Sequence, residues 1–484
     1  MIRNYNIETK DLVGQEVNLA GWVHGRRDHG KIIFIDLRDR SGIVQIVFIP
    51  SKTEVEPREN LRSDLNLYEK AGQLRSEWVI RIKGKVKERP ENMTNPDIET
   101  GKIEIEPLEL EILNKSETMP FPLDTDGHDI EEDVRLKYRY LDLRRSRLQK
   151  NMRLRSEFID RARQFLLKKG FIEIETPILS APTPEGSRDF VVPSRLNPGK
   201  FFALPQSPQQ YKQLLMVAGF EKYFQIARCF RDEDLRADRG FEHTQIDIEV
   251  SFVDQEEFMR IDEEMMTTVM EGMGNKIKQK PFPVFTYDEA MERFGADKFD
   301  LRAEEDKKKG VFAFAWVKDF PFFERAEERN AAHSEALANE WTFTHNPFSH
   351  AKPEHVDWLL NGKNIDKILT TQYDLVCNGL EVGGGSIRAH KPEMLEAVFK
   401  IMGYSKDEIE KQFGHMLEAF KYGAPPHGGI AHGVERLVMT LAGEEYLREV
   451  QAFPQTSSGR TSVMNAPSEL DKKQLKELCL KIEK

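Results

Sequence analysis

One stretch of this 484-residue chain, YFQIARCFRDEDLRADRGFEHTQIDIEVSF at positions 223–252, decides the fold. Side chains alternate between two kinds in both of its limbs, Tyr223–Arg231 and Thr244–Phe252, and this alternation is typical of β-strands. In the second limb one face is apolar, whereas the other carries Asp247 and Glu249. The stretch therefore predicts two antiparallel strands of one sheet, with a polar face that is not ordinary core.

The charged loop between the two limbs points to an anionic ligand. Arg231 and Glu233 fall on the same face by the period of two. Arginine presents several donors in a rigid plane that suits phosphate, so Arg231 is a candidate clamp. A solvated edge hairpin with surface ion pairs explains the same pattern equally well, and the isolated segment does not separate the two interpretations.

Length and composition limit the class of protein. A chain of 484 residues predicts two or more domains, and 39% apolar with 32% charged residues fits a globular protein. The N-terminus has no signal-peptide pattern, and no apolar run approaches the roughly 20 residues that cross a bilayer. Three cysteines lie far apart, without disulfide or metal-ligand spacing. We therefore expect a cytoplasmic protein with no membrane partner. The net charge of −11 restricts any RNA contact to local patches.

Residues 1–112 carry short β-patterns separated by glycines. Five such strands in a small all-β unit predict an OB-fold barrel, whose open face commonly stacks nucleobases. Phe34 and Gln45 lie on successive strands, where one could stack on a base and the other bond its edge. The alternative is that Phe34 packs inside the barrel. The predicted strands are Val17–Val23, Ile32–Leu37, Val44–Phe48, Trp78–Val86 and Ile103–Ile112.

Three segments follow the predicted barrel. Residues 113–134 are rich in proline and acidic residues, which indicates a hinge. Arg135–Arg163 predicts mainly helix, and its many cations either line RNA or form a solvated face with i,i+4 ion pairs. In Phe171–Leu179, Pro177 interrupts an apolar strand, which suits a sheet edge or a bulge.

Asn378-Gly379 between two apolar runs is the strongest short hairpin signal, a type I′ turn. With that turn Asp374 faces Gly383, and Asp374 and Glu381 emerge on one face. Two carboxylates so placed repel each other unless a cation joins them. Mg²⁺ held by these carboxylates and by nucleotide phosphates fits this chemistry.

A bulge in the glycines that follow, Gly383–Gly385, would turn Arg388 onto the same face. Its guanidinium could then bind a substrate carboxylate through two parallel hydrogen bonds.

Three stretches together resemble the ordered motifs of the class II aminoacyl-tRNA synthetases: Gly170–Leu179 the first motif, Phe230–Glu233 the second and Gly428–Arg436 the third. The wording at Leu204–Leu215 and Glu381–Arg388 is similar to that of the bacterial aspartyl-tRNA synthetases within this class. The resemblance covers nearly the whole chain. It implies an α+β protein, with an N-terminal OB-fold β-barrel at 1–112 and a class II catalytic domain, an antiparallel sheet flanked by helices, at 135–484.

The resemblance also implies the reaction and its partners. ATP and L-aspartate would form an aspartyl-adenylate, from which the amino acid passes to tRNA(Asp), in a homodimer built on the first motif. It assigns catalytic roles to Arg231 and Arg436, at the α- and γ-phosphates, and Mg²⁺ to Asp374 and Glu381. The implied aspartate site comprises Glu185, Ser207, Gln209, Lys212, Arg231, Gln245, Asp247, His345 and Arg388. The implied ATP site comprises Arg231, Asp232, Glu233, Glu381, Gly433, Val434, Glu435 and Arg436. The implied anticodon contacts are His29, Phe34 and Gln45.

The chain departs from these relatives in two places. Only a short charged run separates Leu301 from Val311, so the large domain that relatives insert near residues 296–311 is reduced. Gly240 stands where relatives have a glutamine that contacts ATP.

The choice of tRNA is less clear. His29 in the loop RRDHG resembles relatives that also charge tRNA(Asn), whereas Asn92 lacks the glycine that is their second marker. We favour the hypothesis that both tRNAs are charged. The alternative is a non-aminoacylating paralogue, either an asparagine synthetase or an RNA-binding protein, but the three motif arginines Arg231, Arg388 and Arg436 argue against it.

Overall fold

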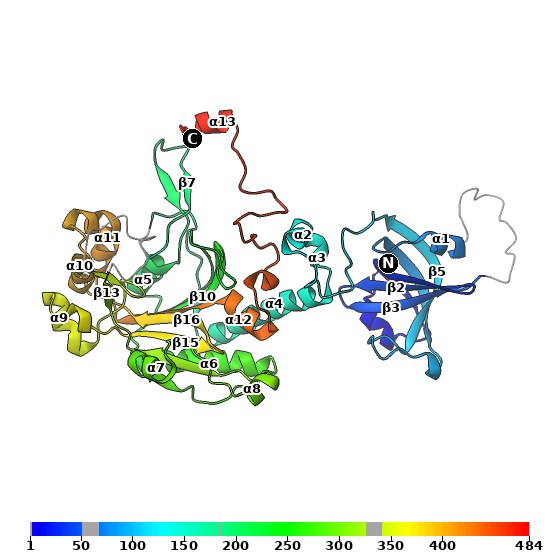
Figure 1. Ribbon diagram of the computed structural model, residues 1–484, viewed down its shortest axis with the longest axis horizontal. Coiled ribbons are helices and arrows are strands. Elements are labelled where there is room, and N and C mark those ends of the chain that lie inside the picture. The colour runs from blue at the N-terminus through cyan, green and yellow to red at the C-terminus, as the bar shows by residue number, and fades with distance from the viewer. Residues whose placement is uncertain (1, 51–66, 183–184, 326–340, 484) are drawn as a thin grey trace. The chain divides into compact units, whose positions relative to one another are not determined.

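The structure is a computed structural model that describes residues 2–50, 67–182, 185–325 and 341–483 (Figure 1). The chain divides into two compact units, Met1–Pro122 and Leu123–Lys484. Within the described ranges, no helix combines the length and the apolar character needed to cross a membrane.

The N-terminal unit is a closed five-stranded barrel in the order β1-β2-β3-β5-β4. Alternate side chains such as Ile33, Ile35 and Leu37 fill its interior, as period-two patterning requires. The predicted OB-fold barrel is thereby confirmed. Its elements are η1 (Asn6–Asp11), β1 (Glu16–His29), β2 (Ile32–Asp39), β3 (Gly42–Phe48), α1 (Leu67–Gln73), β4 (Val79–Glu88), η2 (Glu91–Met93) and β5 (Ile103–Asn114).

Phe34 lies on the outer face of the barrel, because its neighbours Ile33 and Ile35 point inward. The alternative that Phe34 packs inside the barrel is therefore wrong. Gln45 pairs opposite Asp36 on the next strand and shares this outer face.

The second unit is built on an eight-stranded sheet in the order β11-β12-β15-β16-β17-β10-β9-β6. The six inner strands are antiparallel, and β11 and β6 add parallel edges. The predicted antiparallel pair is β9 and β10. The strands of the sheet are β6 (Ile172–Glu173), β9 (Lys222–Phe230), β10 (Glu242–Ser251), β11 (Val284–Thr286), β12 (Phe314–Lys318), β15 (Gln372–Cys377), β16 (Leu380–Ile387) and β17 (His427–Gly433).

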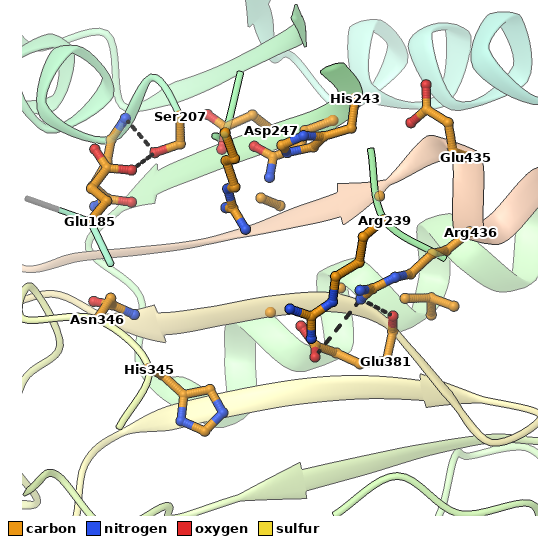
Figure 2. Close-up of a pocket in the computed structure, with 18 of the residues that line it drawn as sticks. Glu185, Ser207, Arg239, His243, Asp247, His345, Asn346, Glu381, Glu435 and Arg436 are labelled. Carbon is orange, nitrogen blue, oxygen red and sulfur yellow. Dashed lines mark hydrogen bonds and ion pairs between the residues drawn. The ribbon is translucent and has the colours of Figure 1, made fainter. Parts of the chain in front are cut away.

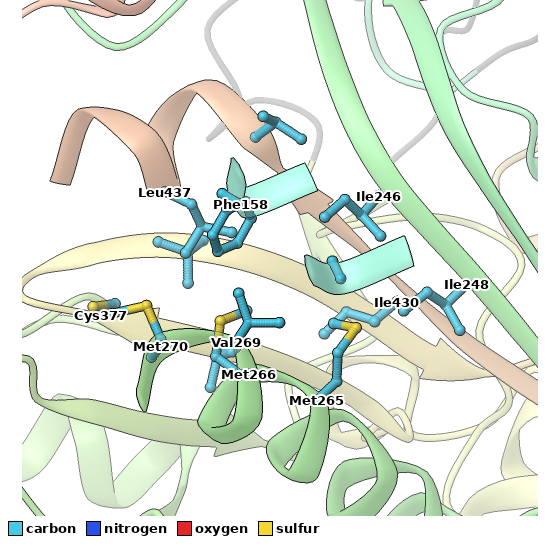
Figure 3. Close-up of a cluster of buried hydrophobic side chains, with 14 of the residues drawn as sticks. Phe158, Ile246, Ile248, Met265, Met266, Val269, Met270, Cys377, Ile430 and Leu437 are labelled. Atoms are coloured by element: carbon cyan, nitrogen blue, oxygen red, sulfur yellow. The ribbon is translucent and has the colours of Figure 1, made fainter. Parts of the chain in front are cut away.

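Helices cover one face of this sheet and leave the other face for the site. The side chains of Ile246 and Ile248 on β10 join a core with Phe158, Met266 and Leu437 from three helices (Figure 3). Figure 1 shows two of these helices, α4 and α12, side by side. The three are α4 (Ser146–Lys168), α6 (Gln255–Gly272) and α12 (Val434–Ala442).

Smaller elements surround the sheet. The connecting segment expected after α6 contains β11, α7 and α8 as well as loop. The remaining strands are β7 (Val191–Pro193), β8 (Phe201–Ala203), β13 (Phe323–Arg325) and β14 (Trp341–Phe343). The remaining helices are α2 (Glu132–Lys137), α3 (Arg139–Asp142), α5 (Gln209–Val217), α7 (Tyr287–Phe294), α8 (Glu304–Lys308), η4 (Pro353–His355), α9 (Val356–Asn361), η5 (Ile365–Lys367), α10 (Pro392–Ile401), α11 (Lys406–Phe420), η6 (Leu447–Val450) and α13 (Lys472–Glu477).

Two predictions for the region before β9 need correction. The strand expected over Phe171–Leu179 comprises only β6, the two residues Ile172–Glu173. It does lie at the sheet edge, as Pro177 indicated. The helix expected over Arg135–Arg163 is divided into α2, α3 and α4.

Three arginines of that helical region are buried, so for them both predicted roles, an RNA contact and a solvated face, are wrong. Arg139 Nη1 and Arg145 Nε donate to the two oxygens of Asp142 at 2.8 and 2.7 Å. Arg135 Nη2 lies 2.7 Å from Glu449 Oε1. These cations join α2 and α3 to η6, far along the chain.

The hairpin of β15 and β16 has the predicted turn. Asn378 and Gly379 have φ angles of 53° and 90°, as a type I′ turn requires. Beyond the first two residue pairs the register shifts by one residue. Asp374 therefore pairs with Gly384, and the predicted pairing with Gly383 is wrong because the bulge lies earlier than expected.

Candidate active site

A cavity of about 280 Å³ opens on the polar face of the sheet (Figure 2). It collects side chains from β10, β16, α5 and α12 and from the loop between β9 and β10. The structure brings together every residue that was predicted to contact aspartate. These residues are Glu185, Ser207, Gln209, Lys212, Arg231, Gln245, Asp247, His345 and Arg388.

Two buried cations at this cavity are each paired with a carboxylate. Lys212 Nζ lies 2.6 Å from Asp247 Oδ1 and 3.2 Å from Glu249 Oε2. Arg388 donates to Glu249 through two hydrogen bonds of 2.9 and 3.1 Å, and its Nη1 donates to Ser386 Oγ. Paired charges of this kind can exist away from water, so the pocket is prepared for a charged ligand.

The two carboxylates titrate in opposite directions. Burial acts to raise the pKa of Glu249, but Arg388 and Lys212 outweigh it and lower that pKa to about 2. Burial raises the pKa of Asp247, and the neighbouring Lys212 only partly opposes the shift. Asp247 Oδ2 is buried without a hydrogen-bond partner, so it can accept a bond from a ligand.

One end of the pocket offers a carboxylate to a positive group. Ser207 Oγ donates to Glu185 Oε2 at 2.5 Å (Figure 2). The main-chain N–H of Gln209, at the start of α5, donates to the same hydroxyl oxygen at 3.2 Å. An ammonium group is the natural partner for Glu185 in this position.

The other end of the pocket is rich in arginine. Arg231 follows directly after β9, and its Nε is buried without a hydrogen-bond partner. Arg436, in the first turn of α12, lies 3.2 Å from Asp238 and donates to the main-chain oxygen of Glu381. Burial, Arg231 and Arg436 lower the pKa of His243 well below its usual range. A neutral ring thus lies among cations that suit phosphate.

Asp374 and Glu381 converge over the glycine strand of β16. A methyl group built on Gly384 would lie 3.2 Å from Asp374 Oδ1 and 3.5 Å from Glu381 Oε1. Asp374 Oδ2 is buried without a hydrogen-bond partner. No group of three or more ligating side chains occurs in the described parts of the chain. The pair therefore fits Mg²⁺ only as a site that phosphate oxygens or water complete.

The two carboxyls of this pair also differ in pKa. Burial acts to raise the pKa of Glu381, but Lys298 and Arg436 lower it to about 2. Lys298 Nζ lies 2.8 Å from Glu381 Oε2. Burial raises the pKa of Asp374 despite His345, whose Nε2 lies 3.5 Å away.

Two residues of the predicted ATP set do not bring their side chains to the cavity. Asp232 lies 3.6 Å from Arg188, and Val434 packs in the core beneath the sheet. Glu233, Glu381, Gly433, Glu435 and Arg436 do line the cavity. A methyl group on Gly240 would meet only a main-chain oxygen at 3.6 Å, so its surroundings leave room for a side chain.

The sequence interpretation missed three residues of the site: Glu249, His243 and Lys298. Glu249 had a clear signal, because it shares the polar face of β10 with Gln245 and Asp247. Lys298 lies far from every motif and had no local signal.

In the N-terminal unit, the predicted anticodon residues occupy one surface. Gln45 is 9% exposed, and Arg27 Nη2 reaches its Oε1 at 3.4 Å while pairing with Asp36. Phe34 is partly exposed beside them, and His29 is exposed at the end of β1.

Comparison with known proteins was made for both units. A family model described as tRNA synthetases class II (D, K and N) matches residues 131–457, and an OB-fold nucleic acid binding domain matches residues 17–113. Aspartate–tRNA(Asp/Asn) ligase of Dictyoglomus turgidum is 41% identical over 592 aligned positions, which cover 97% of this chain and 96% of that protein. The enzyme of the same name from Syntrophomonas wolfei is 39% identical over 606 positions and the full length of both proteins.

Among solved structures, asparaginyl-tRNA synthetase from Pyrococcus horikoshii complexed with asparaginyl-adenylate superposes with a TM-score of 0.72. The match covers 94% of this chain and 98% of that one, at 24% identity, and supports the fold alone.

The alignments also show how the chain differs in length from its relatives. An alignment of 606 positions that includes all 484 residues contains 122 positions occupied only by the relative from Syntrophomonas wolfei. This agrees with the reduced insertion that the sequence predicted. With identity near 40% over nearly their full length to aspartate–tRNA ligases and a matching class II model, the chain belongs to the aspartate–tRNA ligase family of class II aminoacyl-tRNA synthetases.

Proposed function

We propose that the chain activates L-aspartate with ATP and attaches it to tRNA(Asp). The observation that carries this proposal is the pair of buried cations, Lys212 and Arg388, in a cavity that also presents Arg231 and Arg436. A side-chain carboxylate can engage the first two cations, whereas the neutral amide of asparagine brings no charge to them. The second two lie where a bound nucleotide would carry its phosphates.

In the first step, the α-carboxylate of aspartate attacks the α-phosphorus of ATP, and pyrophosphate leaves. Glu185 holds the ammonium group of aspartate, while Arg388 and Lys212 hold its side chain. We assign Arg231 to the α-phosphate and Arg436 to the γ-phosphate, where their charges stabilise the transition state. No protein nucleophile is needed, because positioning and charge neutralisation supply the catalysis.

Asp374 and Glu381 would hold Mg²⁺, which supplies further neutralisation of phosphate charge when it is bound. His345 lies beside this pair. Glu233, Gln245 and Glu435 complete the lining around the reacting groups.

In the second step, a terminal ribose hydroxyl of the tRNA attacks the carbonyl carbon of the adenylate, and AMP leaves with the bonding electron pair. On the OB-fold unit, Phe34 is placed to stack on an anticodon base, and Gln45 offers an amide to a base edge.

Pyrophosphate exchange with aspartate, asparagine and lysine, each supplied alone, tests the amino-acid choice. We expect exchange with aspartate only. Exchange that is equally fast with asparagine would contradict the role of Lys212 and Arg388. Absence of exchange with all three would favour the non-aminoacylating paralogue, which the family comparison does not favour.

We further propose that tRNA(Asn) is charged as well. His29 is exposed at the end of β1, where its imidazole can donate or accept a hydrogen bond, and relatives named for both tRNAs align over nearly the whole chain. Charging of purified tRNA(Asn) with labelled aspartate tests this. Efficient charging of tRNA(Asp) with no product on tRNA(Asn) would refute it.

A homodimer and a cytoplasmic location follow from the resemblance alone. Apolar side chains exposed near the β6 edge, such as Ile172 and Leu179, support the dimer. Light scattering should give twice the chain mass of 56.1 kDa, and a value near one chain mass at micromolar protein would count against it.

A further inference from the structure

The segment between α7 and α8, where the chain is shorter than its relatives, reaches the nucleotide end of the pocket. Phe299 is buried there, and its ring stacks on Phe294 at a centroid distance of 4.0 Å and meets Phe285 edge-on. Asp300 then forms an ion pair with Arg302. These contacts fix the main chain on the C-terminal side of Lys298, so its position is set by the fold.

Lys298 contacts one oxygen of Glu381 and leaves the other available. Its Nζ lies 2.8 Å from Oε2. The second oxygen, Oε1, lies near Gly384 on the side of Asp374 Oδ1. The lysine thus holds the carboxylate in the rotation that directs one oxygen of Glu381 and one of Asp374 to the same point.

We propose that Lys298 is a positioning residue for the divalent cation that accompanies ATP. Partners that bind the outer atoms of metal ligands orient those ligands before the metal arrives. Lys298 also lowers the repulsion between two carboxylates that must lie close together in the empty site. The proposal rests on the proposed function for the need of a divalent cation, but the two can be tested apart.

A competing expectation comes from charge alone. A lysine near a cation site repels the incoming metal, so its removal would then strengthen binding. The ammonium lies on the outer oxygen, and its side chain is 41% exposed, which screens that repulsion. Orientation of Glu381 should therefore outweigh it.

Mn²⁺ serves as the probe, with free Mn²⁺ measured by electron paramagnetic resonance in the presence of a non-hydrolysable ATP analogue. Lys298→Met should weaken Mn²⁺ binding by about tenfold or more. Lys298→Arg keeps the charge and the hydrogen bond and should stay close to wild type. Lys307→Met is the matched control, because Lys307 belongs to α8 and pairs with Glu304 instead. It should bind Mn²⁺ as wild type does.

In pyrophosphate exchange, Lys298→Met should need more Mg²⁺ for half-maximal rate and recover much of its kcat at saturating Mg²⁺. A structural defect would lower kcat at every Mg²⁺ concentration. Lys298→Ala carries the same expectations and replaces the Met variant if that variant does not fold. A folded variant that binds Mn²⁺ as tightly as wild type, or more tightly, overturns the proposal. The titration needs no amino acid or tRNA, so failure of aspartate-dependent exchange in the wild type would refute the proposed function alone.

Discussion

Replacing Arg388 with leucine should have two separable effects. The first is on stability, because Glu249 would lose both hydrogen bonds to the guanidinium and keep only Lys212 at 3.2 Å. Removing one partner of a buried ion pair costs about 3–5 kcal/mol. The second effect is on aspartate binding, where loss of a buried charged partner costs about 2–5 kcal/mol. At ~1.4 kcal/mol per decade this is a loss of about thirtyfold to several-thousandfold.

The double variant Arg388→Leu/Glu249→Leu separates these effects. Because replacing both partners of a buried pair by apolar residues is often neutral, the double variant should regain most of the stability measured by urea unfolding. It should not regain aspartate-dependent exchange if Arg388 binds the substrate. Recovery of both stability and near-normal exchange would refute the assignment of Arg388 and reduce its role to holding Glu249 in place.

Other predictions concern the scaffold of the same unit and the effect of acid. Asp142→Ala strips the buried arginines of α2, α3 and α4 of their shared carboxylate and should cost about 3–5 kcal/mol in urea unfolding. The exposed pair of Arg81 is the control, since Arg81→Ala should cost less than about 1 kcal/mol, and equal costs would contradict the first expectation. The pKa of Glu449 is lowered to about 2 from an ordinary value of 4.5, so its contribution to stability is present above pH 4.5 and is lost as pH falls towards 2. Glu449→Gln should therefore flatten the fall of the melting temperature over that range, and an unchanged slope would show that other groups cause it. Gly429→Ala places a methyl group 2.0 Å from Glu249 Oε2, so aspartate binding measured by calorimetry should be weakened, and normal affinity would show that this part of the pocket yields.

Local signals in the sequence predicted the β9–β10 pair and the β15–β16 hairpin correctly. In both cases the information lies in adjacent residues: alternation in the first and Asn378-Gly379 in the second. The register beyond the turn was wrong by one residue because a bulge depends on how β16 packs between two neighbours. That packing involves β17, which lies far along the chain.

Burial of charge was the main feature that the sequence did not predict. The arginines of α2, α3 and α4 look like a solvated face, but their partner Glu449 is roughly 300 residues away. The same reason hid Lys298, whose partner belongs to another hairpin. Glu249 is different, because its alternation with Asp247 was visible and was not used to assign it to the site.

The hairpin of β15 and β16 has a consequence for how the site is assembled during folding. Asp374 and Glu381 are only seven positions apart, and a two-residue turn joins the strands that carry them. Contacts so close in sequence can form early and at low entropic cost. The cations for the amino-acid side chain, Lys212 and Arg388, come from segments separated by more than 150 residues. A partly folded chain can therefore possess the carboxylate pair before it can distinguish one amino acid from another.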